Sequence, residues 1–290
     1  MTVTVVTDSA AALPPEVADR YGVEVVPLWL HIGDDRYRDG ELGLDAMVAR
    51  FDEPISTASP SPGEFAVAIA EANRRGPVLV LTVAGGISST HDAAVMAAKL
   101  VGDDVAAAPG RVEGRDVAVI DTGTAAGAQA LVVLAAARRA AEGGDLAATA
   151  AAAERAAGAV RLVATVADLD RLAQSGRVPD AARWIGDRLR MRPIFEFRDG
   201  RARPLRPAFS AEAARARIVA RCAAGAAPGA RLHVSVLHAL DEDAAARLVD
   251  LVTPLGPETL MVGPFSPVMV AHTGRGLAGL AWWWEPGAEP

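Results

Sequence analysis

The chain has 290 residues, of which 51% are apolar, enough for the core of one large or two medium domains. Its net charge of −7 argues against the polycationic surface of a nucleic-acid-binding protein. The single cysteine, Cys222, excludes an internal disulfide and a multi-cysteine metal site. The single lysine, Lys99, precedes Leu100 rather than the serine or threonine of a P-loop, so lysine-dependent ATP binding is not expected.

The first half of the chain alternates predicted strands and helices. Apolar runs bounded by turn residues predict the strands, and helical spacing of apolar residues predicts the helices. This alternation is typical of a parallel sheet covered by helices on both faces, with a small hairpin inserted over residues 31–37. The strands are expected at Val3–Thr7, Glu24–Leu30, Val78–Val83 and Val117–Asp121, and the helices at Pro15–Tyr21, Leu44–Phe51, Pro62–Arg75, Ser89–Val101 and Ala125–Glu142.

From Arg161 the pattern changes to α+β, which predicts a mixed sheet with helices on one side. We therefore expect an N-terminal α/β domain over residues 1–158 and a C-terminal α+β domain over residues 159–290. A helix over Leu146–Ala157, capped by Asp145, precedes this boundary. Strands are expected at Val160–Thr165, Pro193–Phe197, Ala202–Arg206, Leu232–Leu237, Thr259–Val262, Val268–Ala271 and Leu277–Trp284, with helices near 168–174, 181–190, 210–224 and 241–252.

Neither a signal peptide nor a transmembrane segment is expected. The N-terminus begins as a strand without a basic region, and the longest apolar run, Ala130–Ala137, is too short to span a bilayer. These features predict a soluble, cytoplasmic protein whose membrane contact, if any, is transient and at the surface.

Two hydroxyl-rich segments each precede a predicted helix. In the first, Ser61, Pro62 and Glu64 occupy the N-cap, N1 and N3 positions of a capping box. In the second, Ser88-Ser89-Thr90 follows a buried strand and a Gly-Gly turn. Helix N-termini offer unpaired N–H groups, so hydroxyls beside them can bind a carboxylate or phosphate at the carboxyl edge of a parallel sheet. Ordinary helix capping explains either segment equally well.

Short motifs run in order along nearly the whole chain, from residue 6 to residue 280. Together they resemble the DegV family of fatty-acid-binding proteins, with Ser89 in place of a usual glycine and Ala58-Ser59 in place of Ser-Gln. The motifs are Val6-Thr7-Asp8-Ser9, Val26-Pro27-Leu28, Thr57-Ala58-Ser59-Pro60-Ser61-Pro62, Ile87-Ser88-Ser89-Thr90, Ser175-Gly176-Arg177-Val178, Met191-Arg192-Pro193-Ile194 with Asp199-Gly200, and Ala271-His272-Thr273-Gly274-Arg275-Gly276.

This resemblance implies a two-domain α/β protein that holds one long-chain fatty acid between its domains, with neither a metal nor another cofactor. It implies that the carboxylate is bound by Thr57, Ser88, His272 and Thr273, and that the acyl chain enters an apolar tunnel. In the family's best-understood members a separate ATP-binding kinase subunit converts the carboxylate into an acyl phosphate for lipid metabolism, so the chain would present substrate without being the enzyme. Secondary contacts are expected from Asp8, Ser9, Ser59, Ser89 and Arg177.

The residues themselves leave alternatives open. Gly86-Ile87-Ser88-Ser89-Thr90 approaches the Gly-x-Ser-x-Gly elbow of hydrolases, which would make the chain a serine esterase or thioesterase using Ser88. A lipid carrier without a kinase partner is the third possibility.

The roles of single residues are open as well. His272 could donate a hydrogen bond to a headgroup, as imidazolium or otherwise, or have only a structural role. Arg177 could contact the headgroup, a partner or only solvent. Core or tail-pocket roles are both open for Trp184, Phe195, Phe197, Met261, Phe265 and Met269.

Overall fold

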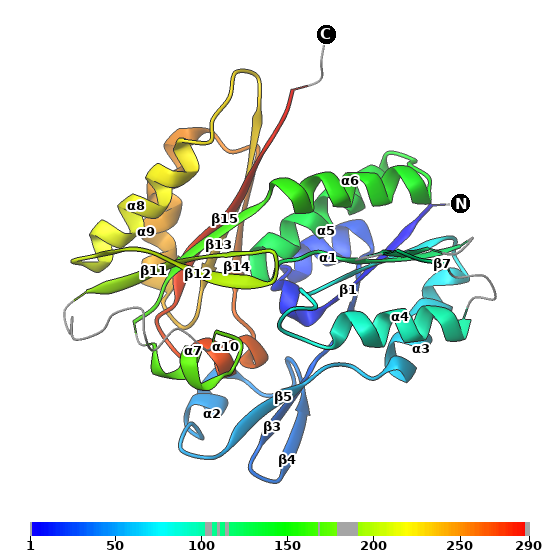
Figure 1. Cartoon of the computed structure of the whole chain (residues 1–290), viewed down its shortest axis with the longest axis horizontal. Coiled ribbons are helices and arrows are strands. Elements are labelled where there is room, and N and C mark those ends of the chain that lie inside the picture. The colour runs from blue at the N-terminus through cyan, green and yellow to red at the C-terminus, as the bar shows by residue number, and fades with distance from the viewer. Residues whose placement is uncertain are drawn as a thin grey trace.

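The computed structural model describes residues 2–101, 106–108, 111–113, 116–167, 169–178 and 191–287. Within these residues two six-stranded sheets flank a pair of helices, and further helices cover the outer faces (Figure 1). The predicted helix over 181–190, which includes Trp184, lies outside the described residues. The expected α/β class is confirmed, with a parallel sheet in the first half and a mixed sheet in the second.

The first sheet has the strand order β2-β1-β6-β9-β8-β7. Its first four strands run parallel, and β8 and β7 are antiparallel additions at one edge. Helices α3 and α4 pack on one face through small and apolar side chains, and α5 and α6 cover the other. The bounds are β1 Thr4–Asp8, α1 Pro15–Tyr21, β2 Glu24–Val26, α3 Pro62–Asn73, β6 Val78–Thr82, α4 Thr90–Val101, β7 Ala106–Ala108, β8 Arg111–Glu113, β9 Val117–Asp121, α5 Ala126–Ala141 and α6 Leu146–Ala159.

The second sheet has the strand order β12-β11-β10-β15-β13-β14, in which only the β13–β14 pair is parallel among the described strands. Helices α8 and α9 cover one face. The other face packs against α5 rather than being left open, so the expectation of helices on one side alone is wrong. The bounds are β10 Arg161–Thr165, α7 Asp170–Gln174, β11 Arg192–Arg198, β12 Arg201–Ala208, α8 Ala211–Ala223, β13 Arg231–His238, α9 Glu242–Val252, β14 Thr259–Pro264 and β15 Ala278–Glu285.

A third, antiparallel sheet of order β4-β3-β5 stands apart from the first two, at the bottom of Figure 1. The predicted hairpin over 31–37 is present as β3–β4, and the segment containing Thr57 forms the third strand, β5. A short helix, α10, packs against this sheet. The bounds are β3 Trp29–Ile32, β4 Asp35–Arg38, α2 Leu44–Val48, β5 Ile55–Ala58 and α10 Pro267–Thr273.

Local signals in the sequence are realised at several places. Ser61 and Glu64 form the predicted capping box at the start of α3, with both reciprocal hydrogen bonds present. Asp145 caps α6 by accepting from the Ala148 N–H. Asp199 and Gly200 both have positive φ and close the β11–β12 hairpin, as a two-residue Asp-Gly turn requires. The strand predicted at Val268–Ala271 is wrong, because these residues lie inside helix α10.

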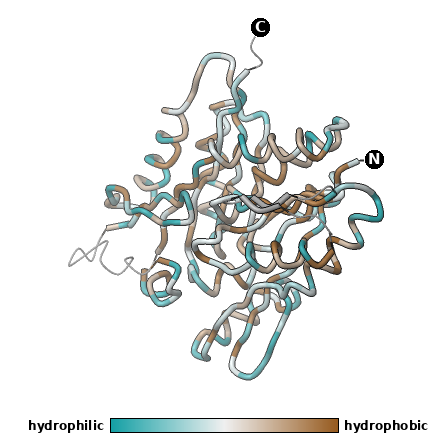
Figure 2. The backbone as a smooth tube through the Cα atoms, turned by 45° about the vertical axis from the view of Figure 1, so that its right-hand side comes forward, coloured by the Kyte–Doolittle hydropathy of each residue, from teal (hydrophilic) through white to brown (hydrophobic). Residues whose placement is uncertain are grey.

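Helix α5 lies between the two large sheets, and its buried side chains are mostly alanine, valine and leucine. At Gly127 the helix approaches β13 so closely that a Cβ atom would lie 2.4 Å from Ser235 Oγ and 2.5 Å from Leu237 Cδ2. Such a contact is far inside van der Waals separation, so only glycine fits without a shift. Figure 2 shows that hydrophobic residues are concentrated in these inner layers, whereas the residues of the β3–β4 hairpin are largely hydrophilic.

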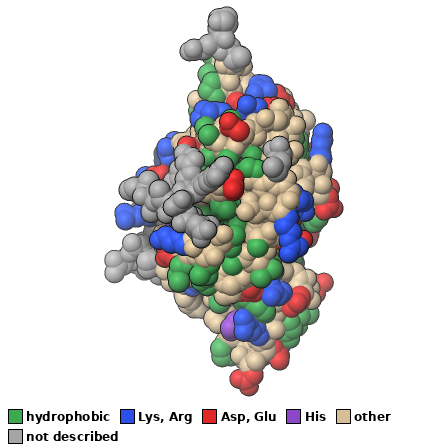
Figure 3. Space-filling model, turned by 90° about the vertical axis from the view of Figure 1, so that its right-hand side faces the viewer, with side chains coloured by type: hydrophobic (Ala, Val, Ile, Leu, Met, Phe, Trp, Pro, Cys, Tyr) green, Lys and Arg blue, Asp and Glu red, His purple; other side chains and the backbone are tan. Residues whose placement is uncertain are grey.

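Among the described residues, none of the helices combines the length and apolarity needed to cross a membrane. On the face drawn in Figure 3, basic and acidic side chains are interspersed, so that face carries no field of a single sign.

Replacing Gly127 by alanine should lower the free energy of unfolding by about 1–3 kcal/mol through overpacking, although alanine is the better helix former. Gly158 in α6 is the matched control, since a Cβ there would meet nothing within 4 Å. Gly158→Ala should raise the free energy of unfolding by about 0.5–1 kcal/mol. Urea denaturation measures both variants, and stabilisation by Gly127→Ala would contradict the close approach of α5 to β13.

Candidate functional site

An apolar pocket opens beside the first turn of α5, between the second sheet and helices α7 and α10. Its cavity volume is about 100 Å³. The walls are almost entirely hydrophobic, and the polar groups are confined to His272, Thr273 and Arg177. The other lining residues are Ile87, Ala125, Ala126, Leu162, Ala164, Leu172, Val178, Phe195, Phe197, Leu237, Phe265, Met269 and Leu277.

The pocket lies at a strained point of the backbone. Ala126 has φ of +53°, in the left-handed region that costs a residue with a Cβ atom about 1–2 kcal/mol. Ala125 just before it is extended, with φ of −152° and ψ of 172°. Strain of this kind is found where a site demands a particular backbone path, and here it brings two small side chains to the pocket wall.

His272 and Thr57 meet at the polar rim although they are 215 residues apart. Thr57 Oγ1 on β5 lies 2.8 Å from His272 Nε2 on α10. Burial, reinforced by the positive charge of Arg177, lowers the pKa of His272 to about 4. The imidazole is therefore neutral at pH 7, rather than the imidazolium considered from the sequence. The nearby guanidinium of Arg177 supplies positive charge instead.

A second polar cluster consists of hydroxyls from the two hydroxyl-rich segments. Ser59 Oγ lies 3.1 Å from Ser88 Oγ and 2.9 Å from Ser89 Oγ. Ser88 Oγ in turn lies 2.8 Å from Thr90 Oγ1 and accepts from the Thr90 N–H at the start of α4. The structure thus brings together the serines of both segments. The cluster adjoins the pocket through Ile87.

The loop that carries Ser88 is held at its base by neighbouring turns. Asp121 at the end of β9 accepts from the Gly85 N–H at 3.0 Å and from the Gly123 N–H at 2.8 Å. The turn of the β11–β12 hairpin rests against the same loop, where a Cβ on Gly86 would lie 3.0 Å from the Gly200 carbonyl oxygen. Both large sheets therefore position Ser88.

Asp8 and Ser9, which were expected as secondary contacts, do not line the pocket and instead hold loops in place. Asp8 is fully buried and accepts from the Val83 N–H at 2.7 Å and from Gln129 Nε2 at 3.2 Å. Burial raises its pKa to about 6. Ser9 Oγ accepts from the Leu28 N–H at 3.1 Å. These bonds tie the end of β1 to β6, α5 and the entry to β3.

Asp39 is a positioning residue that the sequence analysis missed. Its Oδ1 accepts from the Val268 N–H at 3.2 Å, and its Oδ2 accepts from the Ser266 hydroxyl at 2.7 Å. Asp39 thus caps the first turn of α10, the helix that carries His272 and Thr273. Burial raises the pKa of Asp39, although hydrogen bonds from Ser9 and Ser266 oppose that rise. An Asp-Gly pair in a loop signals a turn, and nothing local indicates a contact 227 residues away.

The remaining predicted residues lie at the rim. The Thr273 hydroxyl donates to the Met269 carbonyl at 3.1 Å, so it must rotate before it can serve a ligand. Arg177 is exposed, and its guanidinium donates to the Ser175 carbonyl at 2.8 Å while the side chain borders the pocket.

The hydroxyl cluster does not form a catalytic triad within the described part of the chain. The hydrogen bonds of Ser88 run to other hydroxyls and a backbone N–H, whereas His272 bonds to Thr57 and His91 Nδ1 lies 3.2 Å from Thr82 Oγ1. A nucleophilic serine needs a base within hydrogen-bond reach. Among the same residues, no group of three potential metal ligands is found.

Comparison with known proteins identifies relatives over the full length of the chain. The DegV family model matches residues 2–285. A DegV domain-containing protein of Streptomyces coelicolor is 34% identical, with 96% of this chain and 97% of that protein covered. A Thermus thermophilus DegV family protein described as fatty-acid-binding superposes with a TM-score of 0.88 at 30% identity, covering 98% and 100% of the two chains. DegV of Bacillus subtilis, described as a fatty acid binding protein, has a TM-score of 0.83 at 25% identity, with coverage of 98% and 100%.

The imidazole of His272 should titrate near pH 4 in the ligand-free protein, well below the ordinary value of 6.5. Arg177→Gln should raise this pKa but leave it below 6.5, because burial is the larger cause. Since the unfolded chain binds the proton more readily, His272 makes the folded state less stable as pH falls from 6.5 to 4. Proton–nitrogen NMR of the imidazole measures the titration, and an ordinary midpoint would contradict the buried, neutral geometry.

Proposed function

Because the chain belongs to the DegV family, we propose that it binds one long-chain fatty acid and presents the carboxylate to a separate ATP-dependent kinase subunit. One observation carries the proposal: an apolar pocket ends at a rim formed by His272, Thr273 and Arg177, next to clustered hydroxyls. The fatty-acid binding described for the Thermus and Bacillus proteins supports the ligand class.

The polar rim suits a carboxylate. Thr57 and His272 are within hydrogen-bond distance of each other, and so are the hydroxyls of the Ser59–Ser88–Ser89 cluster. Each of these hydroxyls can rotate to donate to an incoming carboxylate oxygen. A neutral imidazole donates one further hydrogen bond, and the exposed Arg177 borders the rim. The assigned headgroup residues are Thr57, Ser88, His272 and Thr273, with Ser59, Ser89 and Arg177 as secondary contacts.

The apolar pocket suits an acyl chain but must widen to hold a long one. Its volume of about 100 Å³ is below the 300–1,000 Å³ common for ligand sites. Flexible lining side chains such as Met269 can move aside at low cost. Each buried methylene contributes roughly 0.8 kcal/mol, so the tail supplies most of the affinity and can offset this rearrangement.

A role in presenting the carboxylate to a partner is supported by the position of the single lysine and by the exposure of Arg177 at the rim. Its only lysine, Lys99, lies in α4 on the outer face of the first sheet, away from the pocket, so we assign ATP binding to a partner. In the proposed reaction a carboxylate oxygen attacks the γ-phosphorus of ATP, the bond to the β-phosphate oxygen breaks, and acyl phosphate and ADP form. Arg177 at the rim would border the exposed carboxylate during this transfer.

Two alternatives make different predictions. A serine esterase using Ser88 would need a general base, and the described residues place only hydroxyls and a backbone N–H on its Oγ. A simple lipid carrier would bind the same ligand but support no acyl-phosphate formation with any kinase subunit.

Native mass spectrometry of protein purified from cells should show one fatty acid per chain, identified after denaturing extraction.

Thr57→Ala and Ser88→Ala should each weaken fatty-acid binding roughly 10- to 100-fold, since a hydrogen bond to a charged group is worth about 1.5–3 kcal/mol. Ser56→Ala is the matched control, because Ser56 is exposed on the same strand as Thr57.

Failure to find bound lipid, together with no uptake of added palmitate, would reject the ligand assignment. Unchanged binding in both variants would reject the headgroup residues while keeping the ligand. Ester hydrolysis that disappears in Ser88→Ala would favour the esterase.

Arg177→Glu should slow acyl-phosphate formation with a kinase subunit but leave fatty-acid binding nearly unchanged, because charged rim residues mainly affect association rates. The effect should shrink at high salt. ATP turnover and lipid binding are measured on one preparation. Loss of lipid binding would move Arg177 into the headgroup site, and no change in either would make it a solvated surface arginine.

A further inference from the structure

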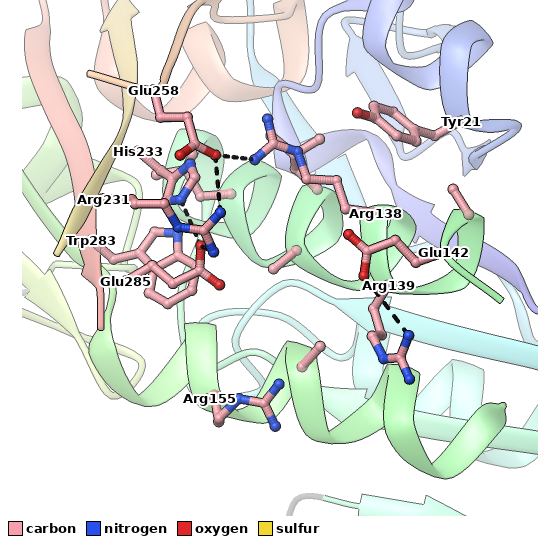
Figure 4. Close-up of a pocket in the computed structure, with 15 residues that line it drawn as sticks. Tyr21, Arg138, Arg139, Glu142, Arg155, Arg231, His233, Glu258, Trp283 and Glu285 are labelled. Carbon is pink, nitrogen blue, oxygen red and sulfur yellow. Dashed lines mark hydrogen bonds and ion pairs between the residues drawn. The ribbon is translucent and has the colours of Figure 1, made fainter. Parts of the chain in front are cut away.

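A second cavity lies at the opposite end of α5 from the apolar pocket. It has a volume of about 500 Å³, within the range common for small-molecule sites. Ala126 at the start of α5 lines the apolar pocket, whereas residues of the same helix from Leu131 to Ala141 line this cavity. With a rise of about 1.5 Å per residue, Arg138 lies roughly 18 Å along the helix from Ala126. Helices α1 and α6 and the strands β13 and β15 complete the walls of this polar cleft (Figure 4).

The strand side of the polar cleft is a connected network with an aromatic floor. The His233 ring stacks on Trp283 with centroids 5.3 Å apart. Its Nδ1 lies 2.9 Å from Thr259 Oγ1, and its Nε2 lies 3.0 Å from Glu285 Oε2. Burial lowers the pKa of His233, so the ring stays neutral at pH 7. These contacts fix the orientation of the His233 ring in the wall.

The carboxylates on that side are already engaged. Glu285 pairs with Arg231, and Glu258 accepts from Arg231 at 3.5 Å and lies 3.7 Å from Arg138. The Arg138 guanidinium also donates to Thr259 Oγ1 at 2.8 Å. Both glutamates are thus neutralised locally, and Arg138 is engaged by Glu258 and Thr259.

The helix side carries arginines with spare hydrogen-bonding capacity. Arg139 lies 3.8 Å from Glu142, a long pair that leaves most of its N–H groups free. Arg155 on α6 faces the cleft in Figure 4 and makes no hydrogen bond or ion pair with another described residue. Tyr21 adds a phenol from α1.

The polar cleft therefore has a positive balance on a negative protein. Four arginines face three glutamates, a net charge of +1 with His233 neutral, while the whole chain carries −7. A concave site with such a lining concentrates anions. Guanidinium groups bind phosphate and carboxylate through paired N–H donors. Arg139 on α5 and Arg155 on α6 can approach a tetrahedral group from different sides, which a planar carboxylate would use less fully.

We propose that the polar cleft is a second binding site, which takes a small phosphomonoester. Its phosphate is held by Arg139 and Arg155, and its organic part lies toward Tyr21 and the His233–Trp283 floor. This site is separate from the proposed fatty-acid site and does not depend on it.

Isothermal titration calorimetry with phenyl phosphate at low salt tests the proposal, with phenol and benzoate as comparison ligands. We expect saturable binding at one site per chain, weaker binding of benzoate and none of phenol. Arg155→Gln and Arg139→Gln should each weaken phenyl phosphate binding at least about tenfold, a change of about 1.4 kcal/mol. Arg247→Gln is the matched control, because Arg247 is an exposed arginine of α9, outside the cleft.

Absence of saturable binding would overturn the proposal. Equal weakening by Arg247→Gln would also overturn it, since the ligand would then be adsorbed by surface charge. Loss of phenyl phosphate binding in Ser88→Ala, with Arg155→Gln unaffected, would place the anion at the carboxylate site instead. Palmitate uptake, measured on the same variants, should be unchanged in Arg155→Gln and Arg139→Gln, so the outcome for the fatty-acid site is read independently.

Discussion

The close packing of α5 between the two large sheets is the contact on which the rest of the structure depends. The helix can approach both sheets because its buried positions are small, with Gly127 against Ser235 and Leu237 as the tightest point. Apolar residues from both sheets join one continuous core through this helix. The carboxyl edge of the first sheet is thereby held against the hairpin turn of the second, and a loop such as Gly85–Ser88 acquires its position from both.

The candidate headgroup site inherits this long-range character. Its hydroxyls and imidazole come from three separate regions of the chain and meet through contacts such as Thr57–His272. The orientation of α10 depends on Asp39, a carboxylate from the third sheet that satisfies the first turn of the helix. A capping residue usually lies immediately before its helix in the chain. Here a residue that is distant in the sequence caps α10 through a tertiary contact.

These features explain which parts of the fold could be predicted from the sequence. Signals completed within a few residues were predicted, including the Ser61–Glu64 capping box and the Asp145 cap of α6. Helix α10 was predicted as a strand because Val268–Ala271 is a short apolar run without helical periodicity, and its cap lies in a distant segment. The arginines of the polar cleft were also missed, since Arg138, Arg155 and Arg231 are scattered along three elements and converge only after folding. The resemblance of short motifs to a known family identified the serines and His272 as candidates. The distances between their side chains could not be predicted, because they depend on tertiary packing.

The shared helix also bears on how the two halves of the molecule can be separated. The predicted boundary near residue 158 falls where the chain passes from α6 to β10, yet α5 lies before it and packs against β13 and β15 after it. A fragment ending at residue 158 would expose that face of α5 to water, and a fragment starting at residue 159 would expose the matching face of the second sheet. The halves are therefore poor units for exchange between relatives. A functional chimera would have to carry α5 together with both of the sheet surfaces that it joins.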